Sequence, residues 1–216
     1  MAGFQVYNAA GALTIDSEAG RAVVRSELKT IGHLSDKGYY AISSAFGNGS
    51  TLGFLQPNFL PVSGLRWFQM RTDGEYCMPG CTLFEEKNGR FMISSNTAAI
   101  QSGYLDVFDA SGNLTWSAVS ASSMPRVRGL FTVPASHDLS SPITLTSPFS
   151  DPWICVSQMP GAISDDGTVT GYSGVLIRRN SSTSYSLQYV SRYQNSYTAA
   201  MGNNGFSIAL ASFVGY

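Results

Sequence analysis

The sequence predicts an all-β fold, either an antiparallel β-sandwich or a barrel-like structure, for this chain of 216 residues. Short runs that alternate apolar and polar residues recur along it, separated by glycine- or proline-containing turns every roughly 8–12 residues. No window has the period and the capping residues of a long helix, and only residues 96–101 offer a helical turn or two. A hairpin-like stretch also occurs twice, once in each half of the chain.

The repeated stretch opens the chain at residues 4–16 and returns without gaps at residues 105–117. Apolar residues at spacing two on either side of an Asn- or Asp-initiated turn predict a β-hairpin in both copies. Gly11 and Gly112 occupy the turns, where a positive φ is expected. The aligned strand positions are Val6 with Val107, Tyr7 with Phe108, Leu13 with Leu114, and Ile15 with Trp116. We expect the matched residues to have the same structural role.

The repeat predicts a boundary between two halves near residues 101–103. We assign residues 1–100 to an N-terminal β domain for docking and assembly. Residues 101–216 form a predicted C-terminal β-sandwich domain for assembly or receptor contact. Two copies are too few for a solenoid, which needs at least about three repeats.

In the first half, strands are predicted wherever an alternating or apolar run is bounded by turn residues. Asn-Gly or Asp-Gly pairs at residues 48–49, 73–74 and 88–89 are typical of tight hairpin turns. Two prolines predict a loop or a sheet edge at residues 56–63, because proline cannot donate to a central ladder. Residues 33–37 are expected to form a turn. The predicted strands cover residues 21–28, 39–43, 52–55, 65–70, 75–78, 82–85 and 90–94.

In the second half, the clearest alternation lies at residues 185–193. Tyr185, Leu187 and Tyr189 share one face there, which we interpret as a core face. Residues 161–174 are expected to be a polar turn region. The apolar segment near the C-terminus is expected to be tied into a sheet. The predicted strands cover residues 129–133, 143–145, 153–157, 174–178, 185–193 and 206–213.

Charged residues are scarce, at 12% of the chain, against roughly 25% in an ordinary globular domain. This favours a protein held among partners, or one that presents a hydrogen-bonding surface to a ligand. With a net charge of −1 and no basic run, a nucleic-acid partner is excluded. No apolar run is long enough for a membrane span. The N-terminus lacks the features of a secretory signal, so we expect no passage through a secretion pathway.

The three cysteines, Cys77, Cys81 and Cys155, are an odd set and do not form a disulfide scaffold. We interpret them as small buried hydrophobic residues. A conditional disulfide between Cys77 and Cys81 is the first alternative. A metal site is the second, and it would also need His33 or His137. No cofactor is expected.

No group of residues predicts catalysis. His137 and Asp138 are adjacent, and in a strand neighbouring side chains point to opposite faces. The chain lacks a Gly-x-Ser-x-Gly motif. Of the clustered acids, Glu75 and Glu85 would be the residues to test for polysaccharide cleavage. Asp165 is expected in a turn that lacks the ligand pattern of a calcium loop. We therefore expect a protein that is not an enzyme.

A tyrosine-rich segment near the C-terminus has the composition of a contact surface, since tyrosine offers a large area with a polar tip. Tyr185 and Tyr189 fit a core face better than a contact surface. Tyr193 and Tyr197 are equally compatible with exposure and with burial. The candidate contact residues for a partner or ligand are Tyr172, Arg192, Tyr193, Asn195 and Tyr197.

Residues 3–11, with residues 15–17 and the strand at 21–25, resemble the beginning of a group of small tailed-bacteriophage virion proteins. These are tail-tip, baseplate or tail-fibre-associated subunits. The resemblance implies a β-rich building block without enzymatic activity, made in the host cytoplasm and located in the virion tail. It implies contacts with other tail proteins and, from the usual symmetry of tails, a homo-trimer. The alternative function is a lectin-like module that recognises a glycan or protein on the host surface.

Overall fold

The computed structural model is all-β. It describes residues 5–7, 9, 11, 13–16, 25–29, 32–34, 39–42, 51–57, 68–69, 76–79, 89–96, 98–157, 159–165, 170–202 and 204–216. These residues contain eighteen strands and two short helices, and every strand pairing among them is antiparallel. The predicted fold class is confirmed.

The largest sheet has six strands and joins both halves of the sequence. Its order is β12 (Arg126–Val133), β18 (Phe206–Ser212), β14 (Trp153–Cys155), β6 (Thr51–Pro57), β9 (Gly89–Ser95) and β3 (Arg25–Lys29). Ile154 of β14 pairs with Leu210 on one side and with Leu55 on the other. The boundary predicted near residues 101–103 therefore runs through one sheet and does not separate two sheets.

The second sheet has five strands. Its main path is β13 (Ile143–Thr146), β17 (Ser184–Arg192), β16 (Thr170–Arg179) and β15 (Gly161–Asp165), and β7 (Phe68–Gln69) also pairs with β16. The polar turn region predicted at residues 161–174 is wrong. Gly161 pairs with Gly174 and Asp165 with Thr170, so this segment is a hairpin. Backbone pairing needs no apolar alternation, which is why the sequence pattern did not reveal these strands.

A three-stranded sheet contains β4 (Gly32–Leu34), β5 (Tyr39–Ile42) and β8 (Tyr76–Pro79). The turn predicted at residues 33–37 is wrong at its start, because His33 pairs with Tyr40 inside the β4–β5 ladder. The loop predicted at 56–63 begins too early, since β6 extends to Pro57, where a strand end tolerates proline. Residues 98–101 are not helical, and the strand predicted at 82–85 lies outside the described residues.

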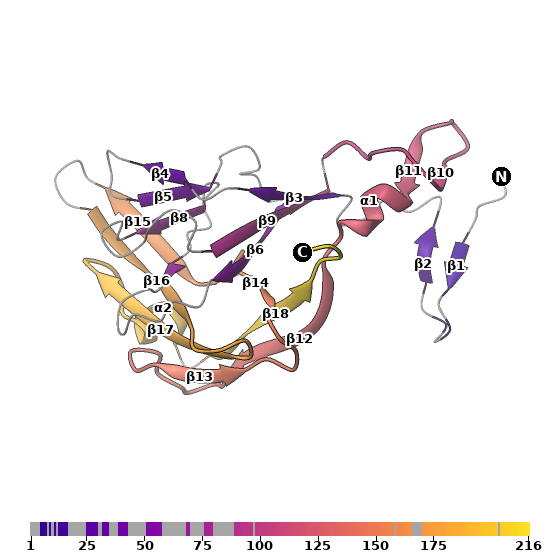
Figure 1. Cartoon of the computed structure of the whole chain (residues 1–216). Coiled ribbons are helices and arrows are strands. Elements are labelled where there is room, and N and C mark those ends of the chain that lie inside the picture. Colours follow the sequence, from indigo (N-terminus) through magenta and orange to yellow (C-terminus); the bar gives the residue numbers. More distant parts are fainter. Residues whose placement is uncertain are drawn as a thin grey trace.

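The two larger sheets pack face to face around one core (Figure 1). The alternating segment of β17 contributes Tyr185, Leu187 and Tyr189, all buried, as the predicted core face requires. The core also contains Leu55, Phe91, Ile93, Phe131, Val133, Leu139, Ile154, Val156, Met159, Val175, Ile177, Tyr197, Ile208 and Leu210. Residues from both halves of the chain meet here, so both halves contribute to one core.

A second apolar cluster lies on the other face of the six-stranded sheet. It contains Phe54, Met92, Trp153, Cys155, Ala211 and Phe213. The Phe213 ring, just after β18, meets the rings of Phe54 and Trp153 edge-on, with centroids 5.3 Å apart in both pairs. The C-terminal strand is thus fixed into the sheet from both faces, as its apolar sequence predicted.

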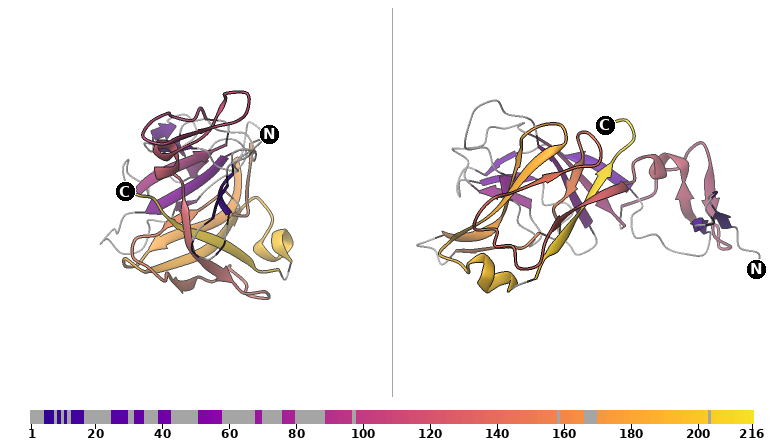
Figure 2. Two further views of the ribbon diagram at one scale, coloured as in Figure 1. Left: turned by 90° about the vertical axis from the view of Figure 1, so that its right-hand side faces the viewer. Right: turned by 90° about the horizontal axis from the view of Figure 1, so that it is seen from below.

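Two separate hairpins and a helix lie to one side of the sandwich, near the N-terminus (Figures 1 and 2). The first hairpin is β1 (Gln5–Tyr7) and β2 (Leu13–Asp16), and the second is β10 (Asp106–Phe108) and β11 (Leu114–Ser117). Helix α1 (Ala118–Ser122) follows β11, and α2 (Tyr197–Met201) packs against β17. Neither helix was predicted, because five residues are too few to show a period. Among the described residues, no helix has the length and apolar character to cross a membrane.

Candidate functional site

The two hairpins have the same backbone design. Val6 pairs with Ile15 and Val107 with Trp116, and after one register shift Tyr7 pairs with Leu13 and Phe108 with Leu114. The turn glycines Gly11 and Gly112 have φ values of +76° and +84°. The repeated hairpin predicted from the sequence is confirmed, and both copies also have a register shift at the same position, which was not predicted.

Asp109 organises the turn of the second hairpin. Its Oδ1 accepts hydrogen bonds from the amides of Ser111 at 2.9 Å and Asn113 at 2.8 Å. Its Oδ2 accepts one from the Asn113 side chain at 2.9 Å. These bonds, the one from the Asn113 side chain first, lower the pKa of the Asp109 carboxyl. The turn is therefore held by its own polar side chains, without help from the sandwich.

Serine side chains connect this hairpin to α1 and to the sandwich. The Ser117 hydroxyl accepts a bond from the Val119 amide at the start of α1. Ser120 Oγ accepts one from the Gln101 amide at 2.8 Å, and Ser123 Oγ accepts one from the Ser26 amide of β3 at 3.0 Å. We call residues 101–122, which contain β10, β11 and α1, the hairpin arm.

The hairpin arm carries negative charge only. It contains Asp106 and Asp109 and no lysine or arginine. The Asp106 carboxylate accepts bonds from the Ser102 hydroxyl and from the Gly103 amide, and these lower the pKa of its carboxyl. Both aspartates are consequently ionised at neutral pH.

Large apolar side chains of the hairpins face solvent. Phe108 is 53% exposed, and Tyr7, its counterpart in the first hairpin, is 55% exposed. Tyr104 is fully exposed and Leu105 is exposed beside it. The backbone of Tyr104 has a φ of +61°, a left-handed conformation that is unfavourable for a bulky residue. Each of these side chains is therefore available to a contact.

Our sequence-based list of candidate contact residues did not include these four residues. One signal was present, because Tyr7 aligns with Phe108 at the same position of the repeat. An aromatic residue retained in both copies of a hairpin has two explanations, core packing and contact with a partner. Both side chains are exposed, so neither of them packs in a core.

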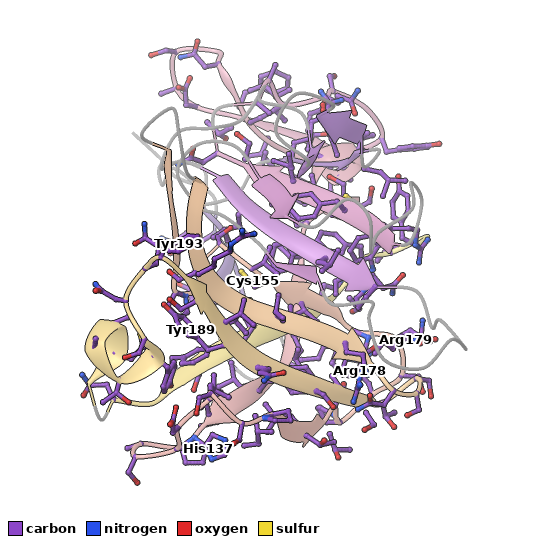
Figure 3. All side chains as sticks on the ribbon, turned by 90° about the vertical axis from the view of Figure 1, so that its left-hand side faces the viewer. His137, Cys155, Arg178, Arg179, Tyr189 and Tyr193 are labelled. Atoms are coloured by element: carbon purple, nitrogen blue, oxygen red, sulfur yellow. The ribbon has the colours of Figure 1, made fainter. Side chains whose placement is uncertain are left out.

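The predicted contact residues at the end of β17 divide into exposed and buried ones. Arg192, Tyr193 and Asn195 are exposed. Tyr193, labelled in Figure 3, directly follows β17; it is 72% exposed and has a φ of +55°. The Arg192 guanidinium lies 5.4 Å from the centre of the Tyr193 ring, within the range of a cation–π contact. These three residues form one small polar and aromatic surface.

Tyr197 does not belong to that surface. It is the first residue of α2 and is buried against Tyr189, with ring centroids 5.3 Å apart. Burial raises the pKa of its hydroxyl. It therefore serves packing, because α2 folds back onto the sandwich. Tyr172 lies in β16, where its backbone pairs with Arg192, so the sheet places these two predicted residues at the same end.

The described residues do not form a metal-binding group. Within them, no three His, Cys, Asp or Glu side chains are placed to hold a metal ion. Cys155 is a free buried thiol whose pKa is raised by burial, which agrees with the interpretation of this cysteine as a small core residue. Cys77 lies in β8, and Cys81, Glu75 and Glu85 lie outside the described residues.

The adjacent pair His137 and Asp138 is held in a turn. The Asp138 carboxylate accepts bonds from the Ser140 amide at 2.9 Å and from the Ser140 hydroxyl at 2.7 Å. These bonds lower the pKa of the Asp138 carboxyl. The Asp138 carboxylate therefore has a structural role, which is to hold its own turn through Ser140.

Comparisons with curated proteins and with solved structures gave no match. One family model matches residues 1–215, and it is described as a domain of unknown function, DUF8377. Because the match covers nearly the whole length, the chain belongs to the DUF8377 family.

Proposed function

We propose that this protein is a structural subunit of a bacteriophage tail that acts through protein–protein contacts of its hairpins. The observation that carries the proposal is the exposed aromatic residue at the same register position of both hairpins, Tyr7 and Phe108. An apolar side chain that is exposed in both copies of a hairpin adds little to the stability of the fold and is available for docking on a partner. The tail assignment rests on the resemblance of the opening residues.

The low charge supports the same function. With 12% charged residues and a net charge of −1, copies of the chain have little repulsion between them. An assembly protein benefits from this, whereas an enzyme that must stay dispersed does not. The expected surroundings are the virion tail and other tail proteins, with several copies of the chain.

Immunogold labelling of purified virions tests the proposal. We expect label on the tail, and its complete absence from virions would contradict the proposal. Virions assembled with a Tyr7→Ser, Phe108→Ser double variant should incorporate less of the protein. A Tyr193→Ser variant removes an exposed aromatic residue outside the hairpins and serves as the matched control.

A second candidate function is recognition of a host-surface glycan or protein by Arg192, Tyr193 and Asn195. It is favoured by the exposure of Tyr193 and by the stacked Arg192 guanidinium. Aromatic rings with nearby polar groups are suited to sugar and protein contacts. Host-cell binding that Tyr193→Ala abolishes and Phe108→Ser leaves intact would support this role. Absence of binding by the assembled protein would count against it.

A further inference from the structure

Asp151 has a strained backbone conformation directly before a proline. Its φ is +54°, in the left-handed region. Aspartate visits this region more readily than most residues, but the proline that follows it, Pro152, favours extended backbone instead. Strain of this kind persists only where the surroundings hold the residue in place, and it gathers at functional sites. Asp151–Pro152 is also the one Asp–Pro pair in the chain.

Contacts from both large sheets hold Asp151. Its amide donates a hydrogen bond to the Ser182 carbonyl at 2.7 Å, and its carboxylate Oδ1 forms an ion pair with the Arg179 guanidinium. Its carbonyl oxygen accepts a hydrogen bond from the Gln56 side-chain nitrogen at 2.6 Å. Gln56 belongs to β6 of the six-stranded sheet, and Arg179, labelled in Figure 3, ends β16 of the five-stranded sheet. The strained residue is therefore clamped between the sheets.

The Gln56 amide is itself oriented by a third group. Gln56 is buried, and its Oε1 accepts hydrogen bonds from the Arg90 guanidinium, from Nε at 2.9 Å. Because a guanidinium only donates, this contact fixes which end of the Gln56 side chain faces Asp151. The amide nitrogen is thus held on the Asp151 carbonyl oxygen. A fixed donor in this position stabilises the negative charge that develops when the carbonyl carbon is attacked.

The Asp151 carboxylate has the connectivity of an internal nucleophile. Attack by a side-chain carboxylate oxygen of aspartate on the carbonyl carbon of the same residue closes a five-membered ring, and a nucleophile within the same residue has a high effective concentration. The leaving group is the Pro152 nitrogen, which becomes a basic secondary amine. The Asp151 side chain is half exposed, so water reaches it. Nucleophile, carbonyl donor, leaving group and water therefore meet at one peptide bond.

We propose that the chain cleaves itself between Asp151 and Pro152. Oδ2 of Asp151, the oxygen not paired with Arg179, attacks the Asp151 carbonyl carbon. The bond from this carbon to the Pro152 nitrogen breaks, and a water molecule gives the nitrogen its proton, which leaves a cyclic anhydride and a hydroxide. The hydroxide then opens the anhydride. One water is consumed in all, and the products are a C-terminal Asp151 and an N-terminal Pro152.

Strand pairing predicts that the two pieces stay together after cleavage. β14 begins one residue after the cut and pairs with β6 of the first piece and with β18 of its own piece. β12 and β13 of the first piece pair with β18 and β17 of the second. Cleavage therefore relieves the strain at Asp151 and leaves the sandwich assembled.

Intact-mass spectrometry of the purified full chain, incubated at neutral and at mildly acidic pH, tests the proposal. We expect two products, residues 1–151 and residues 152–216. They should elute together from a size-exclusion column in native buffer and separate in denaturant. A chain that stays intact at both pH values would overturn the proposal.

The same incubation in urea separates this site from the general acid lability of Asp–Pro bonds. Unfolding removes the Gln56 and Arg179 contacts but keeps the dipeptide, so the folded chain should be cleaved faster than the unfolded chain at the same pH. A rate in urea that equals or exceeds the folded rate would overturn the proposal, because the fold would then add nothing.

Variants that keep the fold assign the roles, with circular dichroism as the check on folding. Gln56→Glu retains an acceptor for Arg90 but has no donor for the Asp151 carbonyl, so it should slow cleavage about tenfold or more. Asp151→Ala should abolish cleavage. Asp138→Ala removes another carboxylate that is held in a turn, and this matched control should be cleaved as the wild type is. Wild-type rates in folded Gln56→Glu or Asp151→Ala would overturn the mechanism.

Discussion

Phe131 and Phe108 are both phenylalanines in strands, yet Phe131 is 1% exposed in the sandwich and Phe108 is 53% exposed in the hairpin arm. Phe131 packs against the Tyr185 ring, with centroids 5.5 Å apart. Phe108 belongs to a two-stranded hairpin, and isolated hairpins of this size are marginally stable in water. The contrast indicates that the sandwich buries its apolar area, whereas the hairpin arm leaves part of its apolar area exposed, as the proposed contact role requires.

The hydrogen bonds of the two regions also differ, because those of the hairpin arm are local and those of the sandwich join distant segments. In the hairpin arm, Asp109 and Asp106 bind amides within a few residues of themselves. In the sandwich, long-range strand pairing joins segments such as β6 and β14. Local bonds hold the shape of the arm without adding to the core. Changes to the arm should therefore alter association, and changes to the sandwich should alter stability.

The largest expected effect is on the core. Phe131→Ala should lower the free energy of unfolding by about 3–5 kcal/mol, since it removes a buried ring and leaves a cavity. Leu130→Ala, the adjacent exposed position of β12, should change it by less than about 0.5 kcal/mol. Urea unfolding followed by tryptophan fluorescence measures both values. Equal effects of the two variants would contradict the placement of the core.

The second effect is a loss of stability at high pH. Burial raises the pKa of Tyr185 to about 12 from its ordinary value of 10. Above pH 10 the unfolded chain loses this proton before the folded chain does, so the free energy of unfolding falls as the pH rises through this interval. We expect a decrease of about 1–2 kcal/mol after allowance for solvent screening. Unfolding of Tyr185→Phe should depend less on pH there, and an unchanged dependence would contradict the assignment to this hydroxyl.

The third effect is confined to the turn of the second hairpin. Gly112 has a φ of +84° and open space where an alanine Cβ would lie, so Gly112→Ala should cost about 1 kcal/mol from backbone conformation alone. Amide hydrogen exchange at Asn113, whose amide binds Asp109, should accelerate. Gly112→Asn is the control and should cost less, because asparagine tolerates left-handed backbone. An equal loss of protection in β17 would show that the turn is coupled to the sandwich.

The smallest effect on stability is expected at Phe108. Phe108→Ser should leave the free energy of unfolding within about 0.5 kcal/mol of the wild-type value, because the ring is exposed. Thermal unfolding of the dilute chain measures this. A decrease as large as that of Phe131→Ala would mean that the ring stabilises the fold and is not reserved for contact.

Much of the fold was predictable from local patterns. Alternation placed β17, and its core face of Tyr185, Leu187 and Tyr189 is buried as predicted. Turn residues and the internal repeat placed both hairpins in register. Such features depend on neighbouring residues alone. The hairpin of β15 and β16 was missed because its polar sequence has no strong alternation.

Long-range pairing was not predictable. Nothing in the sequence of β14 indicates that it lies between β6 and β18, and so the halves proposed from the repeat share one sheet. The candidate site shows a similar limit. Tyr193 and Tyr197 occur in similar polar surroundings, but α2 folds back and buries only Tyr197. Exposure is decided by tertiary packing, which local composition does not report.

Hydrogen exchange of the full chain, compared between the dilute and the assembled state, tests the division between sandwich and hairpin arm most directly. We predict that amides of β10 and β11 exchange faster than those of β17 and β18 in the dilute chain, because marginal hairpins open locally. On assembly, the amides of the hairpin arm should gain protection while those of the sandwich core stay unchanged. Arm amides that are as protected as the core in the dilute chain, and that gain nothing on assembly, would contradict the account.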